Sequence, residues 1–168
     1  MKVREGILNL FPVWVIALGL TALTVQPAFG ADTHIATFWQ EGDTGQMLHL
    51  RGRVVTAEGK PVTGATIMLR QADGSGTYQP QRYQGEISTG PGGVFEVRTV
   101  LPGQYNSAKH IHVTVLHTGF QTLDTELLFI GDPNAAHDQS YGTPVVLEEV
   151  RSAERTLLVG GVELTLSK

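Results

Sequence analysis

The sequence predicts an all-β protein, an antiparallel β-sandwich that follows a signal peptide. From Leu48 onward, short segments of alternating polarity are separated by turns rich in Gly, Pro and Asp, which is the pattern of strands joined by tight connections. Helical periodicity is absent from this part of the chain, except around residues 148–154. Short strands at regular spacing, without helices between them, favour a sandwich.

The expected strands follow one another at regular intervals. Residues 31–46 carry glycines and polar residues with no clear period, so we expect an extended N-terminal segment before a sandwich domain over residues 47–168. Gly and Pro interrupt the apolar pattern at residues 58–61 and 89–93, which we expect to be turns. The strands between such turns are expected at residues 48–55, 65–69, 94–100, 110–116 and 123–130.

The last part of the chain carries a hairpin signal. Gly160 and Gly161 lie between two alternating apolar segments, residues 156–159 and 162–166. Two consecutive glycines permit the positive φ angles that a two-residue hairpin turn requires. We therefore expect two antiparallel strands that are joined at this point.

Residues 1–30 have the features of a secretory signal peptide. Lys2 and Arg4 form a short basic start, residues 7–25 are largely apolar, and Ala28 and Gly30 supply the small residues that a signal peptidase reads. An uncleaved membrane anchor is the alternative, because the apolar run is long enough to span a bilayer. The small residues at its end favour cleavage and export to the periplasm or the medium, with no stable membrane partner afterwards.

The mature chain expected after cleavage would begin at Ala31 and is mildly acidic. The formal net charge of −4 becomes −5, because cleavage removes Lys2, Arg4 and Glu5. This charge disfavours nucleic acid and anionic membrane surfaces as partners. Cysteine is absent, which excludes thiolate metal sites, Cys-attached haem and iron–sulfur clusters. Any metal must therefore be held by nitrogen and oxygen ligands.

The run His110-Ile111-His112 suggests a metal site. Residues two apart on a strand point to the same face, and the β-branched run that follows favours a strand, so the two imidazoles would project side by side. Tyr78 and Tyr105 lie upstream and could complete a four-ligand site. Phenolate oxygen suits Fe(III), whereas zinc sites more often show Cys, further His or carboxylate. The pattern predicts a mononuclear Fe(III) centre.

Five segments around these residues carry a family resemblance. They are an opening strand and turn at 52–65, segments 71–78 and 99–105 that each end in a tyrosine, the histidine pair at 110–112, and a closing strand at 125–133. Together, over residues 50–133, they resemble the intradiol ring-cleavage dioxygenases, the superfamily of catechol and protocatechuate dioxygenases. Five such segments in the right order are a specific pattern.

The resemblance implies an intradiol-type β-sandwich and an Fe(III) ion held by Tyr78, Tyr105, His110 and His112. It also implies a catechol-type aromatic diol and dioxygen as reactants. Tyr78 would be the equatorial phenolate, and Tyr105 would be the axial phenolate that leaves when substrate binds and takes a substrate proton. The ring would then open between its two hydroxylated carbons to give a muconate-type product.

Three positions depart from the family pattern. Ser107 stands where the family usually has arginine, Glu126 stands where it usually has glutamine, and the loop from Tyr105 to His110 is shorter than usual. Strand alternation would place Glu126 on the face opposite to Leu127. If that face lines the pocket, the carboxylate would repel a substrate dianion. We therefore expect Glu126 to slow the turnover of simple catechols.

Two other functions are compatible with these residues. The stretch at 59–65 also occurs in carboxypeptidase-regulatory and transthyretin-like sandwiches, so the chain could be a non-catalytic binding or assembly module. It could also bind metal through the histidine pair without oxygen chemistry. Metal content distinguishes the module from the other two functions, and oxygen uptake with catechols distinguishes the enzyme from the metal-binding protein.

Overall fold

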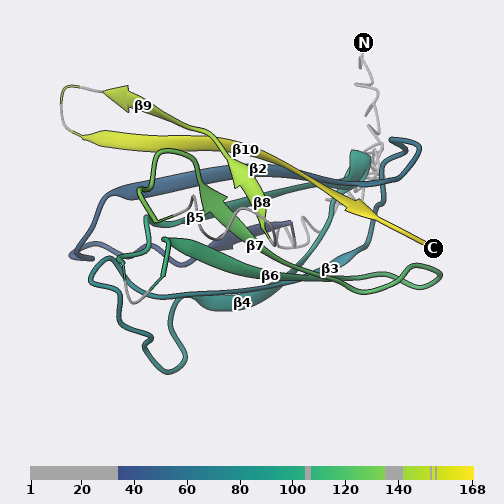
Figure 1. Ribbon diagram of the computed structural model, residues 1–168, viewed down its shortest axis with the longest axis horizontal. Coiled ribbons are helices and arrows are strands. Elements are labelled where there is room, and N and C mark those ends of the chain that lie inside the picture. Colours follow the sequence, from purple (N-terminus) through teal and green to yellow (C-terminus); the bar gives the residue numbers. More distant parts are fainter. Residues whose placement is uncertain (1–33, 105–106, 135–141, 152, 154) are drawn as a thin grey trace, which may run out of the picture.

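The computed structural model describes residues 34–104, 107–134, 142–151, 153 and 155–168, and within them the protein is a two-layer β-sandwich (Figure 1). No helix in this part of the chain has the length and apolar character needed to cross a membrane. The strands are β1 (Ile35–Thr37), β2 (Met47–Thr56), β3 (Thr66–Gln71), β4 (Gln84–Ser88), β5 (Val94–Val100), β6 (His110–Leu116), β7 (Leu123–Phe129), β8 (Thr143–Val145), β9 (Leu147–Arg151) and β10 (Thr156–Leu166), with a 3-10 turn, η1 (Pro91–Gly93), before β5.

Each layer is a five-stranded sheet. One sheet has the strand order β1-β5-β2-β10-β9 and the other β4-β3-β6-β7-β8. The expected all-β sandwich is confirmed, but the expectation of purely antiparallel sheets is wrong. The pairs β1–β5, β2–β10 and β7–β8 are parallel. Parallel neighbours need a long connection. For β1–β5 and β2–β10, the connection includes strands of the other sheet.

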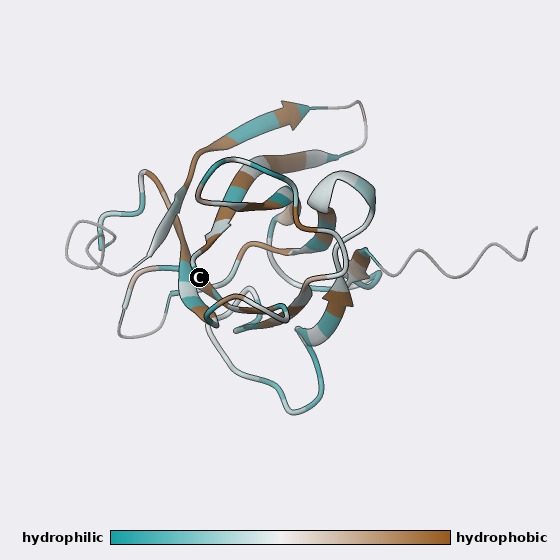
Figure 2. Ribbon diagram, turned by 90° about the vertical axis from the view of Figure 1, so that its right-hand side faces the viewer, coloured by the Kyte–Doolittle hydropathy of each residue, from teal (hydrophilic) through white to brown (hydrophobic). Residues whose placement is uncertain are grey.

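Alternation along the strands builds the core between the sheets. Leu48, Leu50 and Val54 of β2 point inward and are fully buried, and Ile111 and Val115 of β6 meet them from the other layer. Figure 2 shows apolar and polar stretches alternating along the ribbons of both sheets. Because every second side chain enters the core, the remaining side chains of each sheet face outward.

Two sequence expectations at the C-terminal end are wrong. Gly160 and Gly161 do not form a hairpin, because β10 runs straight through them and pairs with β2 and β9. Neither glycine has a positive φ, and a Cβ at Gly160 would lie 2.9 Å from side-chain atoms of Leu147 and Val145. Gly160 thus leaves room for the side chains of Leu147 and Val145 to pack against strand β10. The possible helix that the sequence indicated near residues 148–154 is not formed in the described residues, since Leu147–Arg151 is strand β9.

The N-terminal segment contributes more than an extended lead. Ile35–Thr37 forms β1, which pairs in parallel with β5 at the edge of its sheet.

We name the outer surface of the β4-β3-β6-β7-β8 sheet the site face. The outer surface of the other sheet is named the opposite face.

Candidate metal centre

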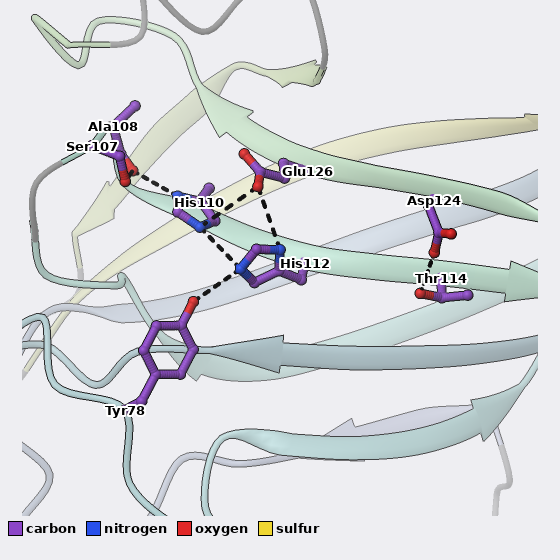
Figure 3. A network of polar contacts seen from close by, with 8 residues as sticks. All are labelled: Tyr78, Ser107, Ala108, His110, His112, Thr114, Asp124 and Glu126. Carbon is purple, nitrogen blue, oxygen red and sulfur yellow. Dashed lines mark hydrogen bonds and ion pairs between the residues drawn. The ribbon is translucent and has the colours of Figure 1, made fainter.

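The histidine pair lies on the site face of β6. His110 and His112 alternate with Ile111 and Val113, whose side chains are buried in the core. The Nε2 atoms of the two histidines are 3.1 Å apart, and the rings meet edge to face (Figure 3). His110 is only 4% exposed, whereas the His112 side chain is 34% exposed. The strand period therefore produces the predicted side-by-side imidazoles, one beneath the surface and one at it.

Tyr78 reaches the pair from a loop between β3 and β4. Its hydroxyl oxygen lies 3.0 Å from Nε2 of His112, and Figure 3 shows the ring pointing toward the histidines from the neighbouring loop. Three donor atoms, two imidazole nitrogens and one phenolic oxygen, thus converge on one region of the site face.

Asp73 holds the loop that carries Tyr78. Its carboxylate accepts hydrogen bonds from the backbone N–H and hydroxyl of Ser75, from the N–H of Thr77 and from the side-chain amide of Gln79. Burial alone would raise the pKa of Asp73, but these hydrogen bonds outweigh burial and lower the pKa to about 2. The charged carboxylate of Asp73 therefore holds the residues that precede and follow Tyr78 in the sequence.

The loop of Tyr78 also contacts the segment that leads to Tyr105. The Gly103 N–H donates a 2.7 Å hydrogen bond to the Asp73 carbonyl, and a Cβ at Gly103 would overlap the backbone nitrogen of Gly76. This approach brings the two segments together without intervening side chains. Tyr105 itself lies outside the described residues, so its predicted role as a ligand stays a prediction.

Glu126 stands on β7 directly beside the histidines. It is the cross-strand partner of His112, and its Oε1 atom lies 3.4 Å from Nδ1 of His112 and 3.9 Å from Nε2 of His110. Leu127 and Phe129 enter the core, as strand alternation predicts, so Glu126 shares the outer face with the histidines. Its side chain is 37% exposed. The carboxylate is therefore part of the site's immediate surroundings and does not point away into solvent.

Both histidines present the same nitrogen to the centre. The Nδ1–H of His110 donates to the Ala108 carbonyl at 2.7 Å, and Nδ1 of His112 faces the Glu126 carboxylate. With Nδ1 of each ring engaged in this way, Nε2 is the nitrogen through which each histidine would hold a metal. Burial lowers the pKa of His112, the nearby His110 and Arg70 lower it further, and Glu126 opposes them. A neutral ring is the form that binds a metal.

The spacing of these donors fits a metal ion. Metal–ligand bonds of about 2.1 Å at right angles place neighbouring ligand atoms about 3 Å apart, close to the 3.0 and 3.1 Å that separate the donors. Within the described residues, His110, His112 and Glu126 also offer ligand atoms that all lie within 4.8 Å of one another. The set combines nitrogen and hard oxygen donors, which suits iron.

The sequence analysis missed Arg70 of β3. This residue is the cross-strand partner of His112 on the side away from Glu126, and its guanidinium lies 5.2 Å from the centre of the Tyr78 ring. Beside it, a groove of about 640 Å³ extends from His112 across β3 to β4. Strand alternation could have placed Arg70 on an outer face, but only the pairing of β3 with β6 brings it to the histidines.

The fold and the converging donors define a β-sandwich protein with a candidate mononuclear metal centre. Residues 23–159 match the family model described as Dioxygenase. The chain is 31% identical to catechol 1,2-dioxygenase 2 of Acinetobacter lwoffii, over 68% of this chain and 53% of that one. The chain belongs to the intradiol dioxygenase superfamily. It spans about half the length of the catechol dioxygenase relatives that it matches.

Solved structures agree with this assignment. The catechol 1,2-dioxygenase from Pseudomonas arvilla C-1 has the same fold, with a TM-score of 0.74 at 22% identity over 80% of this chain and 56% of that chain. The dioxygenase domain of a dioxygenase carbohydrate-binding protein fusion from Streptomyces sp. SirexAA-E gives a TM-score of 0.68 at 27% identity. That comparison covers 79% of this chain and 88% of that domain.

Proposed function

We propose that this protein is a non-haem Fe(III)-dependent enzyme that cleaves a catechol-type aromatic diol between its two hydroxylated carbons. The observation that carries the proposal is the convergence of the Tyr78 hydroxyl and the Nε2 atoms of His110 and His112 within 3.0 to 3.1 Å contacts. Membership of the intradiol superfamily supports the same chemistry. Both atoms of dioxygen would end in the muconate-type dicarboxylate product.

Tyr78, Tyr105, His110 and His112 are the proposed ligands of the iron. Ferric iron would bind the deprotonated diol and make it reactive toward dioxygen. The protein's own part is to hold the donors in place. The Ala108 carbonyl and the Glu126 carboxylate orient the two imidazoles, and Asp73 orients the loop of Tyr78. Tyr105 is proposed to accept a proton from the incoming diol.

The metal and the reaction are tested together on the purified protein. We expect about one iron per chain, a phenolate-to-iron absorption band in the visible range, and oxygen uptake with catechol or hydroxyquinol that yields a muconate-type product. A colourless protein that holds zinc or no metal after iron-replete growth would leave the binding module as the better assignment. Iron without oxygen uptake across a panel of catechols would leave a metal-binding protein, and cleavage outside the diol would contradict the intradiol assignment.

Glu126 is proposed to weaken the binding of simple catechols. Its carboxylate lies beside the histidines, and a negative charge there opposes an anionic diolate. Glu126→Gln keeps an oxygen acceptor for Nδ1 of His112 and removes only the charge. We expect catechol to bind about 5-fold more tightly to the variant, and kcat/KM to rise with it, for a half-exposed charge of this kind. Equal catechol affinity and equal kcat/KM in both proteins at several pH values would show that Glu126 does not affect the substrate.

We also propose that the protein is exported and that the mature chain begins at Ala31. The basic start, the apolar run and the small residues before Ala31 support this. The intact mass of protein recovered from the export compartment is expected to match residues 31–168. A membrane fraction that retains the mass of the full chain would instead favour an anchor.

A further inference from the structure

We propose that Arg70 is a specificity-determining residue that binds an anionic substituent of the aromatic diol in the groove beside His112. The inference rests on the proposed function and deepens it. The preferred substrate class becomes an aromatic diol with a short side chain that ends in a carboxylate. The diol end would occupy the centre, and the side chain would lie along the groove over β3 and β4.

The strand register places Arg70 next to the reacting end of such a ligand. Gln84, Arg70, His112 and Glu126 are successive cross-strand partners on β4, β3, β6 and β7. Neighbouring strands are about 4.8 Å apart, so this row brings a guanidinium one strand away from a candidate ligand. The row runs from a negative charge at Glu126 to a positive charge at Arg70. An anion on the diol's substituent is therefore favoured on the β3 side of the centre.

The charge of Arg70 is not committed to an acid. Arg51, Arg53, Arg82, Arg98 and Arg151 each have a nitrogen atom within 4.0 Å of a carboxylate oxygen. For Arg70, no carboxylate lies within that distance in the described part of the chain. Its guanidinium is instead held over the Tyr78 ring at 5.2 Å. A guanidinium that stacks on a ring, with no carboxylate of the described residues within 4.0 Å, is suited to bind an incoming carboxylate.

The groove has the dimensions and lining for a side chain as well. Its volume of about 640 Å³ lies in the range typical of small-molecule sites, and a bare catechol would fill only a fraction of it. Met68 supplies an apolar wall, and Gln81, Gln84 and Thr114 supply polar groups. Glu86, the cross-strand partner of Met68, is the acidic member of the lining. It would repel an anion that lay farther along the groove, so the carboxylate is best placed at Arg70.

The test compares two ligands that differ in charge and by one methyl group. A catechol with a propionate side chain and the methyl ester of the same compound are titrated, without oxygen, into the iron-loaded full chain and its Arg70→Met variant. Dissociation constants come from the change in the visible absorption band. We expect the acid to bind the parent protein about 5-fold to 20-fold more tightly than the ester does. In Arg70→Met this preference is expected to fall to about 1-fold, with ester affinity unchanged.

One control variant, Arg51→Met, separates this role of Arg70 from a general effect of positive charge. Arg51→Met removes one positive charge from the opposite face, where the Arg51 side chain is 74% exposed, and should keep the full preference for the acid. Equal loss of acid and ester affinity in Arg70→Met would show that Arg70 acts through Tyr78 and would overturn the substrate inference. If the parent protein bound acid and ester equally, the substrate inference would be overturned, whereas the binding of the diols themselves would still support the proposed function. If neither the acid nor the ester bound, both the substrate inference and the proposed function would be overturned.

Discussion

The two outer faces of the sandwich both carry histidine beside glutamate, yet they organise these residues in different ways. On the opposite face, His49 of β2 lies 3.0 Å from Glu96 of β5. The same carboxylate also lies 3.7 Å from Arg51 and 3.4 Å from Arg98. On the site face, Nε2 of His112 lies 3.1 Å from Nε2 of His110 and 3.0 Å from the Tyr78 hydroxyl.

The difference shows why residue type alone does not make a metal site. At His49, positive and negative groups alternate around one carboxylate, and the cluster satisfies itself as a network of surface ion pairs. At His110 and His112, two imidazole nitrogens and one phenolic oxygen converge on one region, which is a set of donor atoms that one metal ion can bind together. Substitutions in the two regions of the molecule test this distinction.

The largest effect is expected from removal of a ligand. His112→Ala should lower iron affinity at least about 100-fold, because loss of a ligand costs more than loss of a group that only orients one. The visible band should disappear with the metal, as measured by metal analysis and absorption after dialysis. His49→Ala, the matched change on the opposite face, should leave iron content at the parent level. Equal iron loss in both variants would place the metal elsewhere or show general unfolding, which circular dichroism distinguishes.

A smaller effect is expected where the two tyrosine segments meet. In Gly103→Ala the new Cβ would overlap the Gly76 backbone, so the segments must separate. We expect the free energy of unfolding to fall by about 2–4 kcal/mol in denaturant titrations. Gly161→Ala on β10 is the control, because a Cβ there meets nothing within 4 Å. Its unfolding free energy should change by less than about 1 kcal/mol, and an equal loss in both variants would contradict the contact.

The smallest effect concerns acid stability. The pKa of Asp73 lies below its ordinary value in the folded protein, at about 2, so its charged form favours folding. That stabilisation is complete above the unfolded value of 3.8 and disappears as the pH falls toward 2. It amounts to about 2 kcal/mol. Asp73→Asn should therefore unfold more easily at neutral pH and show a flatter pH dependence below pH 4 than the parent does.

Glu96→Gln provides the comparison on the opposite face. A hydrogen bond from His49 and the nearby Arg51 and Arg98 lower the pKa of Glu96, while burial opposes them. Because this cluster lies at the surface, its contribution is screened by solvent. The variant should flatten the acid limb of the stability curve less than Asp73→Asn does. The reverse order would show that the surface cluster, and not the Tyr78 loop, dominates acid stability.

Local pattern was sufficient for some strands and not for others. The boundaries of β5 and β6 agree with the sequence prediction, because buried and more exposed residues alternate along most of each strand and segments that contain Gly flank both strands. β4 was missed because only Ile87 of its five residues is buried, and β8 was missed because it is three residues long and contains Pro144. β9 is largely exposed and charged, so neither its polarity nor its spacing distinguishes it from a helix.

The residues of the site differ in the same way: some are predictable from the pattern of one strand, and others are not. Alternation within one strand was enough to pair His110 with His112, whereas the pairing of β6 with β7 brings Glu126 to the same surface. Arg70 became visible only through the pairing of β3 with β6, which no local pattern reports. Gly160 shows the converse case, where a strong local turn signal was overridden because the adjacent β2 and β9 keep β10 extended.

The parallel pairing of β2 with β10 also sets the order in which the protein can fold. It joins residues as far apart as Arg53 and Glu163, a separation of 110 positions, so the centre of one sheet cannot form until almost the whole chain has been synthesised. Contacts of such long range slow folding. A nascent chain that lacks β10 leaves one hydrogen-bonding edge of β2 unpaired and open to chaperones. The sheet β1-β5-β2-β10-β9 is thus completed only after its last strand, Thr156–Leu166, has been synthesised.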